Sequence, residues 1–283
     1  MTSFDWRAVG NVNPRELGKA RHLAHNGAQW LARVACSYSE PATGETHTCL
    51  SWEDDGHALV TPEFFPGLVL ELRLPELVLQ FKEEGKRVTY QFEMDDRSPA
   101  EVEAWLLVEL LHRGVDRDRL SKDLPYKFPG LMTGDAVKYS AIPDEGDLQE
   151  LSHWYANAAS VLGQVRDKHP PGETGPSPIR CWPHNFNMDV IFNRSGDKQD
   201  RSIRVGLAPG DGHYDEPYFY VTPLTYEASE DLPDIPDIGH WHTKDFIGAI
   251  LTGSQIVENA MTGDDIAGFI GAVISAEQER PGA

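Results

Sequence analysis

The sequence has few cysteines, no long apolar run and no recognisable leader. Its three cysteines, Cys36, Cys49 and Cys181, are too few and odd in number, which argues against a disulfide scaffold. No apolar run approaches the roughly 18 residues that a membrane-spanning helix requires. The first residues, MTSFDWRAVG, lack a basic region followed by an apolar stretch, so we expect no signal peptide. We therefore expect a cytoplasmic protein.

Basic residues are scarce relative to acidic ones. The chain has 25 Lys and Arg against 45 Asp and Glu, which gives a formal net charge of −20. This charge repels nucleic acids, because binding to phosphates depends on Lys and Arg displacing counterions. It also disfavours anionic membrane surfaces. We expect no nucleic-acid or membrane partner, and a negative field that either favours neutral polar or cationic ligands or serves solubility alone.

Several well-known catalytic motifs are missing. The chain has no P-loop, no dinucleotide-binding glycine motif after a strand, no nucleophile elbow, no H-E-x-x-H and no C-x-x-C. Each absence lowers the expectation for one enzyme class, and none excludes chemistry built on other residues. Whether the protein is an enzyme stays open.

What is present is sufficient for a folded core. Apolar residues make up 40% of the chain and aromatic residues 10%, and the length corresponds to about two domains or one large one. Composition divides the chain into an amino-terminal half over 1–120, a connecting segment rich in Pro, Gly and Asp over 121–146, and a carboxy-terminal half over 147–283. The two halves could also form one compact domain.

Hydrophobic periodicity and turn signals predict the same order, helix, strands and helix, in both halves. In the first half we predict a helix over 14–26 that stops at Asn26-Gly27, strands over 28–39 and 46–54, a hairpin within 67–95 and a capped helix over 98–113. In the second half we predict a helix over 147–168, strands within 177–193, 201–210, 217–226 and 240–251, and a helix from Thr262 to about 276. Long helices alternating with groups of antiparallel strands favour an α+β fold, with two degenerate halves as an architectural hypothesis.

Three segments of the last third, residues 181–189, 209–220 and 239–245, gather histidines, carboxylates and aromatic rings. Residues two apart in a strand share a face, so His240 and His242 should project together. With His184 they could bind a divalent transition metal, a cofactor that the sequence suggests without establishing. The alternatives are a metal-free acid–base site and ordinary strand histidines bonded to the backbone.

Two carboxylates in these segments are candidates for proton transfer. Asp211 lies on a tight turn, where it could equally be an exposed acidic residue, and Glu216 precedes an aromatic strand. A carboxyl group buried near aromatic rings has a raised pKa and can act as a general acid. The predicted catalytic residues are therefore Glu216, Asp211 and His184.

Five aromatic side chains could form the floor of a binding pocket. Tyr218 and Tyr220 should share one strand face, and Trp182, Phe186 and Trp241 lie in the same segments. Such rings suit a sugar or another flat polar ligand. The alternative is that they are core residues.

The three segments resemble a family of uncharacterised bacterial proteins, domain of unknown function 5996. The pattern C-W-P-H-H-F-D is matched at Cys181, Trp182, Pro183, His184 and Phe186. The pattern S-P-G-D-G-x-Y-x-E-P-Y-[FW]-Y-V is matched over 209–221 except at the open positions, and Ala208 replaces its first Ser. The pattern G-H-W-H-T-E-G-[FW]-x-G-A-[VI]-L is matched over 239–251 except at Lys244-Asp245. Asn185 and Asn187 replace the His and Asp of the first pattern, which weakens a metal site there. The resemblance implies family membership over most of the chain, and it implies no activity, substrate or cofactor.

These features support three hypotheses. The first is a small-molecule-binding protein or enzyme with a polar–aromatic pocket in the carboxy-terminal half. The second is a structural or interaction protein in which the same residues form a buried polar network. The third is a divalent-metal-binding module. The first requires His184, Glu216 and His242 to converge on one open cavity, and the sequence leaves substrate, oligomeric state and pathway open.

Overall fold

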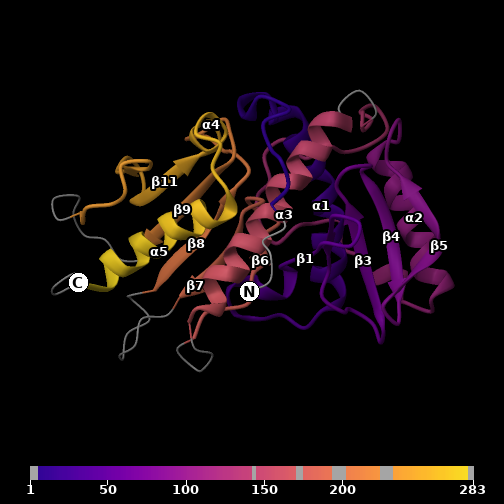
Figure 1. The fold of residues 1–283 in the computed structure, drawn as a ribbon. Helices are drawn as coiled ribbons and strands as arrows, with labels where there is room; N and C mark the ends of the chain where they lie inside the picture. The colour runs from indigo at the N-terminus through magenta and orange to yellow at the C-terminus, as the bar shows by residue number, and fades with distance from the viewer. Residues whose placement is uncertain (1–5, 142–144, 170–174, 193–201, 224–231, 280–283) are drawn as a thin grey trace. The chain divides into compact units, whose positions relative to one another are not determined.

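The computed structural model describes residues 6–141, 145–169, 175–192, 202–223 and 232–279 (Figure 1). The helices are α1 (Gly18–Tyr38), α2 (Pro99–His112), α3 (Glu145–Asp167), α4 (Gly253–Glu258) and α5 (Gly263–Glu279). The strands are β1 (Ser51–Glu53), β2 (Ala58–Val60), β3 (Leu68–Arg73), β4 (Val78–Glu83), β5 (Lys86–Glu93), β6 (Arg180–Cys181), β7 (Met188–Phe192), β8 (Ile203–Ala208), β9 (Tyr218–Pro223), β10 (His240–His242) and β11 (Gly248–Thr252). Helices combined with antiparallel sheets confirm the predicted α+β class. Among the described helices, none has the length and hydropathy of a membrane span.

The chain divides into two compact units, which are described one at a time. The β1–β5 unit comprises Leu17–Ser152 and Cys181–Phe186. The β7–β11 unit comprises Met1–Glu16, His153–Arg180 and Asn187–Ala283. The sequence predicts halves over 1–120 and 147–283 joined by the segment 121–146. In the structure, residues 1–16 belong to the β7–β11 unit and residues 181–186 belong to the β1–β5 unit.

The β1–β5 unit is built on a five-stranded antiparallel meander. One face of the sheet is apolar, with Leu70 opposite Phe81 and Leu72 opposite Leu79. Helix α2 lies beside β4 and β5 in Figure 1, and its Trp105 ring is 5.6 Å from the Phe81 ring. The predicted hairpin is confirmed: Glu84 and Gly85 join β4 to β5 with φ of 47° and 76°, as a tight hairpin turn with two positive φ angles requires.

The prediction for the first helix was wrong. Instead of stopping at Asn26-Gly27 and continuing as a strand over 28–39, the chain forms one helix, α1, from Gly18 to Tyr38. Gly27 marks a close approach, because a Cβ there would lie 3.0 Å from Leu72 Cδ2. Asn26 is buried and fully used, since its Oδ1 accepts the Met132 N–H and its Nδ2 donates to the His22 carbonyl. Tertiary packing thus overrides a local stop signal.

Other local signals gave mixed results. The capping box of Ser98 and Glu101 at the start of α2 is confirmed, and Thr262 bonds reciprocally with Asp265 at the start of α5. Of the strand expected over 46–54, Ser51–Glu53 forms strand β1 and Leu50 forms a single bridge to Cys181, because Thr43–Thr48 forms short 3-10 turns. The cysteines are free thiols, and no hairpin joins Cys36 on α1 to Cys49.

The β7–β11 unit contains an antiparallel sheet in the order β10-β11-β9-β8-β7, with β6 at the β7 edge. Directly opposite residues share a face, so one row across the sheet runs His240, Ile250, Tyr220, Gly206 and Asp189. Trp241, Ala249, Val221, Val205 and Val190 form the row on the other face. Helix α5 runs alongside β8 and β9 in Figure 1 and contributes a buried apolar stripe that includes Phe269 and Ile270. The face that carries His240, Tyr220 and Asp189 also carries a buried cluster of Ala208, Tyr218, Tyr220 and Ile250.

Candidate functional site

A tyrosine hydroxyl lies between two imidazoles on the His240 face of the β7–β11 sheet. Tyr214 comes from the turn before β9, and its Oη is 2.9 Å from His240 Nε2 and 3.0 Å from His242 Nδ1. The two histidines are two residues apart on β10, so the alternation of the strand directs both rings to this hydroxyl. His240 is exposed, whereas His242 and Tyr214 are half-buried. We call these three residues the Tyr214 cluster.

The hydrogen bonds of the cluster have one consistent direction when both rings are neutral. His242 Nε2 contacts the Lys244 carbonyl oxygen, which can only accept, so Nε2 carries a proton. His242 Nδ1 is then an acceptor, and the Tyr214 hydroxyl donates to it. The Tyr214 oxygen in turn accepts a hydrogen bond from the N–H group of His240 Nε2. This order leaves the unshared electron pair of His240 on Nδ1.

The pKa shifts of His240 and Tyr214 favour the neutral forms of these two residues. Partial desolvation of the His240 ring by the groups around it lowers its pKa below the usual value although the residue as a whole is exposed, and the neighbouring His242 lowers it further. Burial raises the pKa of Tyr214, and the Asp211 carboxylate raises it further. Near neutral pH, His240 is therefore an unprotonated base and Tyr214 is a protonated donor.

Aromatic rings and one carboxylate hold the cluster in place. Asp211 Oδ1 accepts the backbone N–H groups of His213 and Tyr214, and Oδ2 accepts the Tyr218 hydroxyl at 2.6 Å. The Tyr214 and Tyr218 rings are 4.8 Å apart. Phe246 stacks on His242 at 4.2 Å. Asp211, predicted to be catalytic, is thus placed as a positioning residue for the turn and for Tyr218.

The second tyrosine of β9 belongs to an adjoining buried network. The Tyr220 hydroxyl donates to Asp189 Oδ2 at 3.1 Å, and Arg204 Nε lies 3.5 Å from the same oxygen. Burial and the Asp189 carboxylate raise the pKa of Tyr220 well above its usual value. Tyr218 and Tyr220 are both buried. The prediction that they share a strand face is confirmed, and the rings of Tyr214 and Phe246 pack against the buried cluster that contains them.

Glu216 has different partners from the histidines. Its buried carboxylate accepts a hydrogen bond from Arg15 Nε at 3.2 Å and another from the backbone N–H of Ser254. Ser254 is in the first turn of α4, whose free N–H groups attract a carboxylate. These contacts favour a structural role for Glu216 over the predicted role of general acid.

Residues 181–186, which include the predicted site residues Trp182, His184 and Phe186, lie in the β1–β5 unit. Its Pro183 carbonyl accepts hydrogen bonds from His25 Nε2 and Gln29 Nε2 of α1. Phe186 is fully buried and stacks on His25 at 4.7 Å, and burial lowers the pKa of His25 to about 4. Phe186 is therefore a core residue rather than a pocket floor.

Trp182 and Trp241, the two tryptophans of the predicted pocket floor, lie in different units. Trp182 and His184 lie edge to face at 5.7 Å, with His184 exposed and Trp182 half-buried. Trp241 lies in the row opposite to that of His240, and its Nε1 donates to the Pro233 carbonyl. The five rings were predicted as one floor, but within the β7–β11 unit only Tyr218 and Tyr220 among them share the face of the cluster. The convergence of His184 with Glu216 and His242 stays a prediction.

A metal site receives no support from the described residues. Within them, no three His, Cys, Asp or Glu side chains are disposed to hold a metal ion. His240 Nε2 and His242 Nδ1 are each hydrogen-bonded to the Tyr214 hydroxyl. The described residues therefore do not support His184, His240 and His242 as a set of metal ligands.

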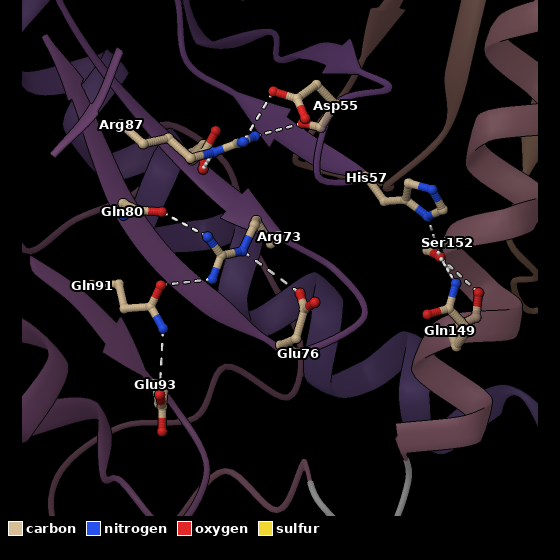
Figure 2. A network of polar contacts seen from close by, with 11 residues as sticks. Asp55, His57, Arg73, Glu76, Gln80, Arg87, Gln91, Glu93, Gln149 and Ser152 are labelled. Carbon is tan, nitrogen blue, oxygen red and sulfur yellow. Dashed lines mark hydrogen bonds and ion pairs between the residues drawn. The ribbon is translucent and has the colours of Figure 1, made fainter. Parts of the chain in front are cut away.

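The β1–β5 sheet also carries a polar network, on the face away from its apolar core (Figure 2). Arg73 donates to Gln80 at 2.7 Å and to Gln91 at 2.8 Å, and Arg87 bonds to the buried Glu71 at 2.6 Å. These are cross-strand pairs of β3, β4 and β5, the unit by which sheets are stabilised. The network is therefore interpreted as structural.

Figure 2 also shows a serine and a histidine at the distance of a nucleophile and its base. His57 Nδ1 is 3.0 Å from Ser152 Oγ. The Ser152 hydroxyl, however, donates to the Gln149 carbonyl at 2.7 Å, so the imidazole must donate to the serine. Ser152 is also fully buried. A nucleophile needs the reverse direction and access to substrate, so this pair is structural.

The sequence interpretation missed the central residue of the site. Tyr214 lies in the segment 209–220 and matches the tyrosine of the family pattern, but the sequence assigns it no role. The polar partners Arg15 and Asp189 were also missed. Arg15 is 201 residues from Glu216 along the chain, and no local pattern signals that contact.

Comparison with known proteins adds no relative to this description. No family model matches the chain, and neither does any curated protein sequence or solved structure. The resemblance to domain of unknown function 5996 therefore stays a prediction that rests on the three segments.

Proposed function

We propose that the protein binds a small polar molecule at the Tyr214 cluster and transfers a proton to or from it. The observation that carries this proposal is the Tyr214 hydroxyl held between His242 and the exposed His240. His240 is the general base in this account, Tyr214 is the relay, and His242 is the final proton acceptor. No metal is required.

The proton path is balanced within the cluster. A ligand proton taken by His240 Nδ1 gives an imidazolium, which passes its Nε2 proton to Tyr214. Tyr214 passes its own proton to His242 Nδ1, so the positive charge moves to His242. The Lys244 carbonyl, which already accepts from His242 Nε2, stabilises that charge. The reverse order returns the proton to the ligand, as general acid–base catalysis requires.

The charges near the cluster indicate the class of ligand. Asp211 and Asp245 lie on its two flanking loops, and the chain has a net charge of −20. This field disfavours anions and suits neutral polar or cationic molecules. The rings of Tyr214 and Phe246 offer a partly buried flat surface beside the histidines.

We expect Tyr214→Phe and His240→Gln to abolish ligand binding or turnover at this site. A panel of neutral polar and cationic compounds is screened by saturation-transfer NMR, and each hit is incubated in D2O to follow exchange of its carbon-bound protons. Loss of a positioned base should slow exchange by about 10²-fold or more. Tyr90→Phe is the matched control, since it removes the hydroxyl of a tyrosine that is 76% exposed on β5.

The structural hypothesis makes the opposite forecast for the same variants. If hits bind Tyr214→Phe and His240→Gln as well as the wild type, or if the panel yields no saturable ligand, the cluster is not a binding site. The second hypothesis, a polar network that only stabilises the fold, is favoured by the contacts of Glu216 and Asp189. This structural hypothesis predicts that Tyr214→Phe lowers the free energy of unfolding and leaves ligand binding unchanged.

A further inference from the structure

A cavity lies within the β1–β5 unit, between α1 and α2. It has a volume of about 250 Å³, and its walls include Asn26, Gln29, Trp30 and Arg33 of α1 and Pro99, Ala100 and Glu103 of α2. Leu131, Met132 and Tyr139 of the connecting segment complete the enclosure, with Lys122 also in the lining. Nothing in the Tyr214 cluster contributes to this cavity.

Arg33 is the feature of the cavity that points to a ligand. Its side chain is only 9% exposed, and its guanidinium lies 4.6 Å above the Trp30 ring. Nε donates to the Ser121 carbonyl, whereas Nη2 is 3.5 Å from Glu103 Oε1 and makes no hydrogen bond among the described residues. A guanidinium has five N–H donors, and a buried donor without an acceptor is costly.

Neighbouring polar groups in the wall are already used inside the protein. Trp30 Nε1 donates to the Tyr139 hydroxyl at 2.9 Å. Gln29 donates to Pro183 and accepts from Tyr126, and Asn26 accepts from Met132. Apart from the Glu103 carboxylate, which lies 3.5 Å from Arg33 Nη2 as an ion-pair partner, these wall groups give Nη2 no acceptor, so water or a bound molecule can supply a closer one.

We propose that this cavity binds a small organic monocarboxylate, with its carboxylate on Arg33 and its apolar body against Trp30, Leu131 and Met132. The lining carries two positive groups, Arg33 and Lys122, and one negative group, Glu103, so its net charge is 2 − 1 = +1. One net charge matches a monoanion, and Glu103 repels a second negative charge. The apolar walls require an apolar body, which inorganic phosphate lacks.

The size of the cavity restricts the ligand further. Sites for drug-sized ligands occupy about 300–1,000 Å³, and this cavity is smaller. Benzoate, which has a planar carboxylate and a single ring, is a suitable probe. Benzamide has nearly the same shape without the charge, and inorganic phosphate has charge without the apolar body.

The test is a titration of the full-length chain followed by 1H–15N NMR. The Trp30 indole signal, assigned with Trp30→Phe, should shift saturably with benzoate. Benzamide should bind at least about tenfold more weakly than benzoate, since a hydrogen bond to a charged group contributes roughly 1.5–3 kcal/mol. Phosphate should not shift the signal.

Three variants make the test specific. Arg33→Met should abolish benzoate binding, and Ala100→Leu should do the same by filling the cavity while Arg33 stays intact. Ala104→Leu is the matched control, because Ala104 is an exposed residue on the same helix and should leave binding unchanged. If Arg33→Met does not fold, Ala100→Leu still decides the result.

The contrary outcomes are distinct. Absence of a saturable shift with benzoate at millimolar concentration overturns the proposal, and so does a shift that persists in Ala100→Leu. Equal binding of benzamide excludes recognition of the carboxylate by Arg33. Tighter binding of phosphate than of benzoate would show an anion site of another class and overturn the monocarboxylate assignment.

Discussion

Gly206→Ala should lower the free energy of unfolding by about 3 kcal/mol, as overpacking of a tight site does. Gly206 lies between Tyr220 and Asp189 in the row that crosses the β7–β11 sheet. A Cβ at this position would lie 2.6 Å from the Tyr220 hydroxyl and would also collide with the Met188 carbonyl oxygen. A backbone oxygen cannot move aside as a side chain can, so β7 and β8 must separate.

Urea unfolding of Gly206→Ala measures this effect, with Gly268→Ala as the matched control. Gly268 is on the exposed side of α5, and a Cβ there meets nothing within 4 Å. Alanine should raise stability at this helical position by roughly 0.5–1 kcal/mol. If the two variants unfold at the same urea concentration, Gly206 is not a site of close approach and the described packing of Tyr220 over it is incorrect.

Glu216→Ala should have the second largest effect, a loss of about 2–3 kcal/mol of unfolding free energy. The variant removes a carboxylate that is 4% exposed and leaves the Ser254 N–H at the start of α4 without its acceptor. Arg15→Gln should cost less than about 1 kcal/mol, because the Arg15 side chain is 60% exposed and its ion pair is screened by water.

The comparison of these two variants separates stability from chemistry. We expect Glu216→Ala to unfold earlier and to bind ligands of the Tyr214 cluster normally once folded. A variant as stable as the wild type that no longer binds such ligands would restore Glu216 to the site and contradict its structural role. Chemical denaturation and the NMR screen described above provide both readouts.

Much of the local structure could be predicted from sequence. Turn and cap residues act through their immediate neighbours, so Glu84-Gly85 and the pairs Ser98–Glu101 and Thr262–Asp265 gave correct elements. Strand alternation likewise placed His240 with His242, and Tyr218 with Tyr220. These signals depend on contacts a few residues apart, which a single sequence contains.

Contacts between distant parts of the chain could not be predicted. The register that places His240 in the row of Tyr220 depends on β11 lying between them, with Ile250 opposite both. A shift of one residue would have placed Trp241 on that face instead. Asn26-Gly27 failed as a stop signal for the same reason, because Leu72 and Met132, far along the chain, determine its environment.

The proton positions on His240 and His242 test the central claim most directly. Long-range 1H–15N NMR spectra, recorded at a pH where both rings are neutral, should show each ring protonated at Nε2 and unprotonated at Nδ1, with the pKa of His240 below its usual value of 6.5. Tyr214→Phe should change the signals of both rings at once. A proton on His240 Nδ1, or rings that respond independently of Tyr214, would contradict the relay and the function proposed from it.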